Sequence, residues 1–403
     1  MMRHTILIII SIILYSNLYA QDPPALDGKI LYHSYSGYEN WDGELFILDL
    51  SDNSVTNISS EWSVSHAING MFSPDGTKIV FMADGDGWLQ DWDIFLWTVG
   101  DEEPVNLTGP FSTKREEDPK FSPDGNTIVF KKNGDIVTMD LEGNILANVT
   151  NTPGIEESMP YYSTDGNEIL FAPGAGSGSD IYSIKVDGTN RRAIVAQPNY
   201  QEYYPITRDS ESFFYTGWVS SSNVNDQVYL KYYYSSSSIH LPFNTTNANY
   251  SDATPAGSQY TVISSTRSGG NGGYDLYIAD IDTGNIWSLD AYNNTINTNR
   301  EELGAHYLPS SSLSANNPTL DKIQVSVYPN PVLQNKEINI NIQNSETIAG
   351  SAIQVINLQG QILQSNLTKD LSNFKFKMDY EPGVYFVKIV QNNKVHIEKI
   401  ILK

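Results

Sequence analysis

The sequence contains no cysteine, which excludes disulfide bonds and thiolate metal sites. It is also poor in basic residues, with 24 Lys and Arg against 47 Asp and Glu and a formal net charge of −23 at pH 7. Because proteins that bind nucleic acids carry basic surfaces, we expect no nucleic-acid partner. Without disulfides, the fold must depend on its apolar core and on strands whose edges are covered.

Long hydrophobic runs are absent after residue 20. The apolar run that begins at Ile6 follows Arg3 and ends before the small residue Ala20, which is typical of a secretory signal peptide over residues 1–20. A transmembrane anchor is the alternative, but the run is too short to span a bilayer comfortably. We therefore expect a secreted chain that begins at Gln21 and has no transmembrane segment after export.

One ten-residue stretch occurs three times in the first half of the chain. Each copy has an aromatic residue and Ser at its start, Asp-Gly at its centre and Phe at its end; the copies are residues 72–81, 121–130 and 162–171. Ser, Pro and Gly at the first, second and fourth positions of the turn favour type I geometry. The β-branched and aromatic residues behind the turn are typical of a buried strand. Each copy is therefore predicted to form a strand, a tight turn and a second strand.

Four strands that recur every roughly 40–50 residues are the signature of a β-propeller blade. The repeat resembles the TolB-type, or PD40, β-propeller family over most of residues 28–309. Five complete blades are predicted, at about residues 63–107, 113–149, 156–194, 200–240 and 249–289. Residues 28–59 supply only the second to fourth strands of a blade, and Glu302 to Pro309 would supply its first strand. Pairing these two ends closes the ring, so we predict an all-β, six-bladed propeller over residues 21–309.

The repeat ends before residue 310. Residues 310–318 are rich in Ser and Asn and are predicted to be a linker, and alternating segments beyond it predict a small immunoglobulin-like β-sandwich over residues 319–403. With Tyr328-Pro329-Asn330-Pro331 and the last strand Lys399 to Lys403, this segment resembles the type A sorting domain of the type IX secretion system of Bacteroidetes. The resemblance implies a secreted or cell-surface protein with the type IX secretion machinery as a partner. An unrelated immunoglobulin-like module is the alternative.

Aromatic residues concentrate in loops that a propeller would place around its channel mouth. Those loops enter each innermost strand or join the second and third strands, and flat rings beside polar groups suit stacking on sugar rings. The predicted substrate-binding residues are Trp41, Trp62, Trp88, Trp92, Tyr203, Trp218 and Tyr274. For each Trp, the alternative is packing between neighbouring blades.

Acid–base candidates on the same face are few. The predicted catalytic residues are His66, His306, Tyr204, Arg267 and Arg115. His66 and His306 stand near the start of innermost strands in adjoining blades, and we expect them to face one another across the channel mouth. Removing a proton beside a carboxylate needs a base such as His or Tyr and a cation that neutralises the acid. A structural role is the alternative for each His.

Other motifs indicate no chemistry. The segment from Asp84 to Asp93 contains several Asp but lacks EF-hand spacing, so a solvated loop is predicted. No cofactor or metal site is predicted, although a metal ion bound in the channel stays open as an alternative. The sequence has no Gly-Xaa-Ser-Xaa-Gly motif, which excludes the arrangement in which a propeller guards a serine peptidase.

The leading hypothesis is a secreted carbon–oxygen lyase or dehydratase that acts by β-elimination on an acidic, uronic-acid-containing polysaccharide such as an ulvan-like glycan. Propeller families with that activity resemble this chain only in fold and in available residue types. The net acidity counts against a polyanionic substrate, unless Arg and Lys cluster locally. The alternatives are a non-catalytic cell-surface propeller that binds a glycan or a protein, and a TolB-like partner in an envelope complex, which fits export poorly. The chain is expected to be a monomer.

Overall fold

The computed structural model describes residues 22–84, 92–109, 115–174, 178–310, 324–334, 336–343, 351–357, 362–368, 374–391 and 394–403. The chain divides into two compact units, Met1–Ala315 and Asn316–Lys403. The predicted signal peptide lies outside the described residues, as does most of the predicted linker, so both stay predictions. Among the described residues, no helix is long and apolar enough to cross a membrane.

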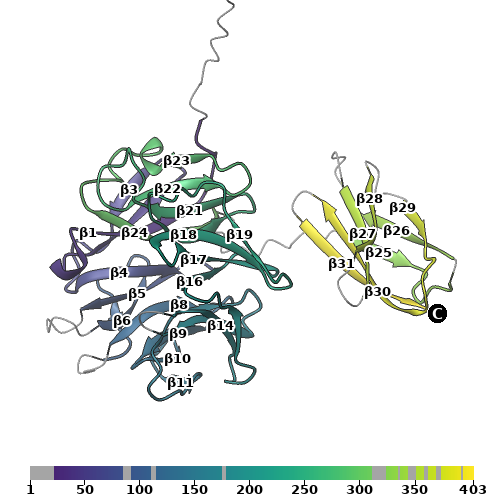
Figure 1. The fold of residues 1–403 in the computed structure, drawn as a ribbon, viewed down its shortest axis with the longest axis horizontal. Helices are drawn as coiled ribbons and strands as arrows, with labels where there is room; N and C mark the ends of the chain where they lie inside the picture. The colour runs from purple at the N-terminus through teal and green to yellow at the C-terminus, as the bar shows by residue number, and fades with distance from the viewer. Residues whose placement is uncertain are drawn as a thin grey trace, which may run out of the picture. The chain divides into compact units, whose positions relative to one another are not determined.

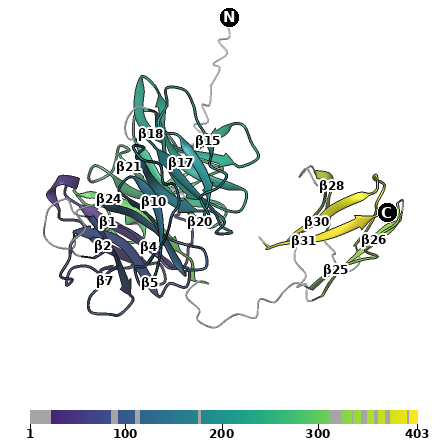
Figure 2. The same ribbon diagram turned by 90° about the horizontal axis from the view of Figure 1, so that it is seen from below.

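The first unit contains six four-stranded antiparallel sheets, which are the blades of a propeller (Figures 1 and 2). Blade 1 contains β24 (Glu301–Leu308), β1 (Lys29–Tyr35), β2 (Glu44–Asp49) and β3 (Ser54–Asn57); blade 2 contains β4 (Ser65–Phe72), β5 (Lys78–Asp84), β6 (Trp92–Thr98) and β7 (Val105–Asn106); blade 3 contains β8 (Glu116–Phe121), β9 (Thr127–Lys132), β10 (Asp135–Asp140) and β11 (Ile145–Asn148). Blade 4 contains β12 (Glu157–Tyr162), β13 (Glu168–Pro173), β14 (Ile181–Lys185) and β15 (Arg192–Val195); blade 5 contains β16 (Glu202–Thr207), β17 (Ser212–Ser220), β18 (Asn223–Tyr232) and β19 (Ser238–His240); blade 6 contains β20 (Tyr250–Ala256), β21 (Tyr260–Ser265), β22 (Asp275–Asp280) and β23 (Ile286–Ser288). Two short 3-10 helices, η1 (Tyr38–Asn40) and η2 (Leu289–Ala291), complete the unit.

The repeated Ser-Pro-Asp-Gly stretch forms the predicted tight turn between the first two strands of a blade. Ser73 donates from Oγ to the Asp75 carboxylate at 2.6 Å and accepts from the backbone N–H of Lys78 at 2.9 Å. Asp75 also accepts from the backbone N–H of Thr77, and Gly76 adopts a φ of 71° that a side chain would disfavour. The two later copies repeat these bonds, so the turn is fixed by its own side chains.

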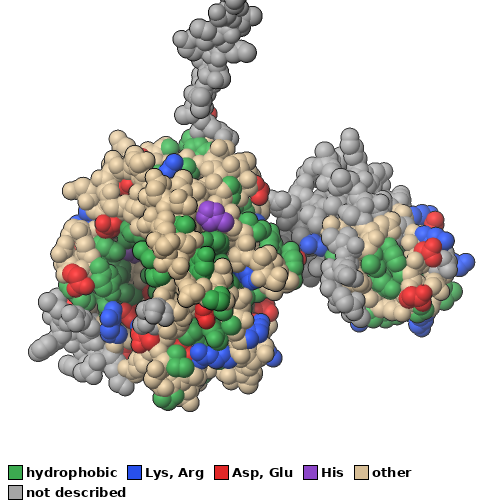
Figure 3. Space-filling model, in the orientation of Figure 1, with side chains coloured by type: hydrophobic (Ala, Val, Ile, Leu, Met, Phe, Trp, Pro, Cys, Tyr) green, Lys and Arg blue, Asp and Glu red, His purple; other side chains and the backbone are tan. Residues whose placement is uncertain are grey.

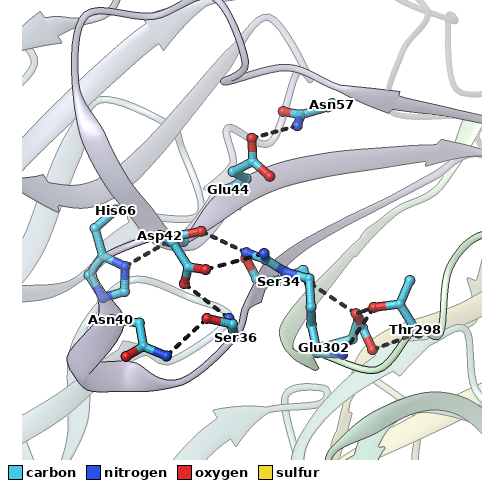
Figure 4. Close-up of polar contacts among 11 residues, drawn as sticks. Ser34, Ser36, Asn40, Asp42, Glu44, Asn57, His66, Thr298 and Glu302 are labelled. Atoms are coloured by element: carbon cyan, nitrogen blue, oxygen red, sulfur yellow. Dashed lines mark hydrogen bonds and ion pairs between the residues drawn. The ribbon is translucent and has the colours of Figure 1, made fainter. Parts of the chain in front are cut away.

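The ring closes as predicted, because β24 at the end of the propeller pairs with β1 at its start. In this antiparallel pair Ser34 lies opposite Glu302 and Leu31 lies opposite His306. Glu302 accepts hydrogen bonds from the hydroxyls of Ser34 (2.9 Å) and Thr298 (2.7 Å), as Figure 4 shows. The closing strand is thus held by side chains as well as by its backbone.

Arg300, which the sequence did not single out, fastens the closing strand to the loop after β1. Its guanidinium donates to the Ser34 hydroxyl at 3.1 Å and to the Asp42 backbone carbonyl at 2.7 Å, and it forms an ion pair with the Asp42 carboxylate at 3.2 Å. Asp42 in turn accepts from the backbone N–H of Ser36 at 3.0 Å. Arg300 therefore links the closing strand to the 36–42 loop.

Each innermost strand contains a residue in the left-handed region of φ at an equivalent point where the strand register shifts; β4 contains a second such residue, His66. The six equivalent residues, which we call the channel ring, are Asn69, Asp118, Met159, Tyr204, Asp252 and Gly304, with φ between 47° and 59°. A bulge of this kind bends a strand and redirects the side chain it carries. All six positions are partly accessible, because they line the central channel.

The second unit contains two antiparallel sheets, in agreement with the predicted β-sandwich. The sheets are β25 (Gln324–Tyr328), β26 (Glu337–Gln343) and β29 (Phe374–Lys377), and β28 (Ile362–Thr368), β27 (Ser351–Asn357), β30 (Gly383–Gln391) and β31 (Lys394–Leu402). Their inward-facing side chains, including Ile338, Val355, Val387 and Ile400, form one buried cluster. This unit therefore has a hydrophobic core of its own.

Candidate functional site

The central channel holds a cavity to which all six innermost strands contribute. Its volume is about 560 Å³, including the part that is open to solvent. It is lined by the channel ring and by the residues two positions further along each strand: Met71, Lys120, Tyr161, Ile206, Thr254 and His306. Residues far apart in sequence therefore share one cavity, as the predicted ring implied, and two of the predicted catalytic residues, Tyr204 and His306, are among them.

The charged groups inside the channel are two carboxylates and one ammonium. Asp118 accepts a hydrogen bond from the side-chain amide of Asn69 at 2.8 Å. Burial raises the pKa of Asp252 to about 6 and also raises that of Asp118, whereas burial lowers the pKa of Lys120. Both carboxylates act electrostatically on Lys120 and oppose that change. The channel thus places two carboxylates and a cation among mainly apolar neighbours.

Four tyrosines and a carboxylate surround the channel mouth. Tyr203 donates a hydrogen bond to Asp226 on β18, and its ring lies edge-on to Tyr204 with centroids 5.5 Å apart. Burial raises the pKa of Asp226, against the effect of hydrogen bonds from Tyr203 and Tyr274. The pKa of Tyr35 is raised by burial and then by the charges of nearby carboxylates. Of the predicted residues, the mouth thus brings together Tyr203, Tyr204 and Tyr274.

A second aromatic cluster stands beside the mouth in blades 1 and 2. Trp41 lies 4.9 Å from Trp92 and 4.9 Å from His66 between ring centroids, and Tyr38 lies 5.9 Å from Trp92. Tyr35 connects this cluster to the mouth, with its ring 6.1 Å from His66. Trp92 is 1% exposed, whereas Trp41 and Tyr38 retain accessible surface. The cluster therefore presents part of two rings to solvent.

Each of three propeller histidines uses its Nδ1 atom to accept a backbone hydrogen bond. His66 accepts from Gly43 at 2.8 Å, His33 from Asn69 at 3.3 Å and His306 from Phe72 at 3.3 Å. In the neutral imidazole the proton must then lie on Nε2, so that nitrogen is a donor and not a base. Burial lowers the pKa of His66 to about 4 and those of His33 and His306 to about 3. All three are neutral at pH 7.

We expect His66→Gln to flatten the dependence of stability on pH. In the native state the pKa of His66 is about 4, against an ordinary value of 6.5, because burial disfavours the imidazolium. Between these values the unfolded chain binds a proton that the native chain does not, so stability is full above pH 6.5 and falls as the pH drops toward 4. From pH 7.5 to 4.5 the wild type should lose about 2–3 kcal/mol more than the variant in urea unfolding. Parallel profiles would contradict this assignment.

The predicted arginines do not meet the predicted histidines. Arg115 forms an ion pair with Glu117 at 2.5 Å, and Glu117 also accepts from Lys131 at 2.7 Å. Lys131 forms a second pair with Glu156 at 2.5 Å. Arg267 lies over the ring of Tyr277 in blade 6, 5.4 Å from its centroid, and does not line the channel cavity. His66 likewise lies outside the cavity lining, so the expectation that it faces His306 across the channel is wrong.

The predicted aromatic residues fall into three groups. Trp62 and Trp92 are buried, contrary to their prediction as exposed loop residues: Trp62 stacks on Phe81 at 5.1 Å and packs against Trp97, because it fills the space between blades 1 and 2. Trp218 is partly exposed on the long strand β17. Trp88 lies outside the described residues. Trp41, Tyr203 and Tyr274 are therefore the predicted rings with accessible surface near the mouth.

The sequence analysis missed the channel carboxylates, Lys120 and Asp226. A signal existed for the ring itself, because Asn69, Asp118 and Met159 each stand four residues before the Ser that opens a repeated turn. No repeated turn predicts the position of Asp226. It lies on β18, and β17 and β18 are longer than the corresponding strands of the other blades, so the spacing of the repeat does not apply to them. Among the described residues, no group of three or more His, Asp or Glu side chains could hold a metal ion.

Comparisons with known proteins identify the C-terminal unit. Residues 326–403 match the family model of the secretion system C-terminal sorting domain. This match indicates export through the type IX secretion system, so the protein is secreted or attached to the cell surface. A search of curated proteins finds no match for the chain.

Solved structures resemble the propeller at low sequence identity. A TolB-type protein from Agrobacterium tumefaciens is 14% identical, with a TM-score of 0.46, and the match covers 70% of this chain and 99% of that one. A chain of a nidogen–laminin complex is 12% identical, with a TM-score of 0.49 and coverages of 69% and 98%. An oligogalacturonate lyase in complex with manganese is 15% identical, with a TM-score of 0.41 and coverages of 65% and 74%. None of these likenesses is close enough to indicate a function.

Proposed function

Because residues 326–403 are a secretion system C-terminal sorting domain, we propose that the propeller works outside the cell and binds a glycan at its channel mouth. The observation that carries this proposal is the grouping of Tyr203 and Tyr274, from two different blades, around the carboxylate of Asp226, with Tyr35 of a third blade beside Tyr274. All four side chains keep accessible surface. Phenol rings supply flat faces for sugar rings, and carboxylates accept hydrogen bonds from sugar hydroxyls.

The electrostatics of the mouth favour a neutral glycan over a polyanion. In blade 3, Arg115 is paired with Glu117, and Lys131 is paired with Glu117 and Glu156. On the face of the propeller drawn in Figure 3, basic and acidic side chains lie interspersed and form no broad basic surface. A polyanionic chain would meet uncompensated carboxylates at the mouth, which opposes its binding. We therefore expect neutral oligosaccharides to bind more tightly than uronic-acid oligomers.

A β-elimination lyase is the second candidate. It is supported by the cavity that His306, Tyr204 and Lys120 share, because these residues supply an imidazole, a phenol and an ammonium, respectively. Against it, the Nδ1 atom of His306 accepts a backbone hydrogen bond, and burial raises the pKa of Tyr204 far above the range in which a phenolate forms. Neither group is therefore prepared as a base at neutral pH.

The two candidates are separated by one set of measurements on the full chain. We expect binding to neutral oligosaccharides on a glycan array, followed by calorimetry on the best ligand, with no rise in absorbance of an unsaturated product from pectin, alginate or ulvan. Tyr203→Ala and Tyr274→Ala should each weaken binding by about tenfold, since loss of an aromatic contact costs on the order of 1 kcal/mol.

Tyr234→Ala is the matched control, because Tyr234 is 77% exposed and lies in blade 5 outside the mouth. It should leave the affinity unchanged. Formation of an unsaturated product that disappears in Tyr204→Phe would favour the lyase instead. An array with no bound glycan, measured on folded protein, would exclude both.

A further inference from the structure

Four blades carry a buried glutamate at the same place, two residues before the channel ring. They are Glu116, Glu157, Glu202 and Glu302, and each is at most 1% exposed. Their equivalence is confirmed by a backbone hydrogen bond to the preceding blade, in which Glu157, Glu202 and Glu302 donate to Gly134, Ser179 and Tyr274 at 2.8 Å each. Differences among the four positions therefore reflect side chains and not backbone.

Three of these glutamates have partners within the chain. Glu116 forms an ion pair with Lys132 at 2.5 Å, and Glu157 pairs with Arg191. Glu302 accepts from two hydroxyls, as described above. Burying a carboxylate without such partners costs free energy of folding, and these contacts offset that cost.

Glu202 has no partner for either carboxylate oxygen among the described residues. The backbone amide of Gln197 lies near the carboxylate but does not reach hydrogen-bonding geometry. The reason lies on the neighbouring strand: Glu116 stands opposite Lys132, whereas Glu202 stands opposite Gly217, which has no side chain. The cation that balances the charge in blade 3 is thus missing from blade 5.

A second carboxylate beside Glu202 has lost its partner as well. In blades 1 to 3 the acid that begins the third strand accepts from an Asn amide thirteen residues later, in the pairs Glu44–Asn57, Asp93–Asn106 and Asp135–Asn148 at 2.7–2.9 Å. The corresponding acid of blade 4 is Asp180, and Ala193 stands in the place of the Asn. The Asp180 carboxylate is partly exposed, accepts no hydrogen bond from the described residues and acts electrostatically on Glu202.

We propose that Asp180 and Glu202 bind a calcium ion between blades 4 and 5, in place of the side-chain partners that the other blades carry. Two carboxylates are hard oxygen ligands of the kind that Ca²⁺ takes. The buried hydroxyl of Tyr215 lies on the same strand as Gly217, and the charge of Glu202 acts on it. Since the protein is exported, it meets Ca²⁺ at the millimolar concentrations that weak extracellular sites require. The remaining ligands are neutral oxygen atoms and water.

The site is tested by thermal unfolding of the full chain, first stripped with EDTA and then titrated with CaCl₂ at constant ionic strength. At ten times the dissociation constant, Ca²⁺ should raise the melting temperature of the wild type by about 3 °C. Glu202→Gln and Asp180→Asn should abolish this shift. Ala193→Asn, which restores the partner found in blades 1 to 3 at an exposed position, should stabilise the apo protein and weaken Ca²⁺ binding at least tenfold.

Asp135→Asn is the matched control, because Asp135 is the equivalent acid of blade 3 and its amide partner is in place. It should keep the Ca²⁺ shift. An unshifted wild type that also retains no Ca²⁺ in equilibrium dialysis overturns the proposal, and so does an equal shift in Asp180→Asn. A melting temperature that does not respond to Ca²⁺, but responds to pH between 5 and 8 in a way that Glu202→Gln removes, would mean that Glu202 is simply protonated, since burial raises its pKa to about 7. Failure of the Ca²⁺ test would leave the proposed glycan site unaffected, because the two sites use different residues.

Discussion

A chain that ends at residue 300 should show no cooperative unfolding transition, whereas a chain that ends at residue 310 should unfold sharply. The difference between the two is strand β24, which forms six register pairs with β1. At about 1 kcal/mol for each hydrogen bond, its backbone contacts alone contribute on the order of 6 kcal/mol. Loss of the strand also exposes Leu31, which is fully buried, at a further cost of about 1.5–3 kcal/mol. The sum rivals the 5–15 kcal/mol that holds a typical domain folded.

The measurement is thermal unfolding followed by near-ultraviolet circular dichroism, with both chains beginning at Asp22. A peptide of residues 298–310 added to the shorter chain should partly restore the transition, because it can pair with the open edge of β1. Equally sharp transitions in the two chains would mean that the ring is stable without its closing strand. Removal of the C-terminal unit is common to both chains, so it does not enter the comparison.

The closure of the ring was predictable because its signal is carried by repeats. The Ser-Pro-Asp-Gly turn marks the first two strands of blades 2 to 4, and the incomplete blade at the start needs the strand left over at the end. The register of β24 on β1 follows from the need to bury Ala305 in the core shared with blade 6 and Leu308, on the opposite face, in the core shared with blade 2. Each of these signals is local or periodic, which is the kind of information that one sequence contains.

The site was predictable only in part, because its geometry depends on backbone conformations that the sequence does not display. Loop position selected Tyr203, Tyr204 and Tyr274, which lie near one another, but it also selected Trp62, whose ring fills the gap between two blades. Likewise, Arg267 is in a loop of the expected kind, yet its guanidinium lies over Tyr277. Whether a loop side chain turns to the channel or to the next blade depends on packing volumes, and a linear pattern does not report these.

The channel ring leads to the second large prediction, which concerns Gly304. Five of the six ring positions hold residues with side chains, and Asn69, Asp118 and Met159 adopt the same left-handed φ of 54–56°. The backbone conformation itself is therefore tolerated at this point of the fold. Gly304 is required for another reason: a Cβ atom there would lie 2.5 Å from Cε1 and 2.7 Å from Nδ1 of His33.

Gly304→Ala should consequently lower the free energy of unfolding by about 3 kcal/mol, since His33 is 3% exposed and has no space into which to move. In a His33→Ala background the same substitution should cost only about 1 kcal/mol, which is the cost of the left-handed conformation. The double-mutant cycle, measured by urea unfolding, should thus give a coupling of about 2 kcal/mol. A coupling near zero would mean that the backbone, and not His33, makes glycine necessary; the ring would then be less uniform than its φ angles indicate. A large coupling would instead identify His33 as the side chain that occupies, in blade 1, the space that ring side chains fill elsewhere.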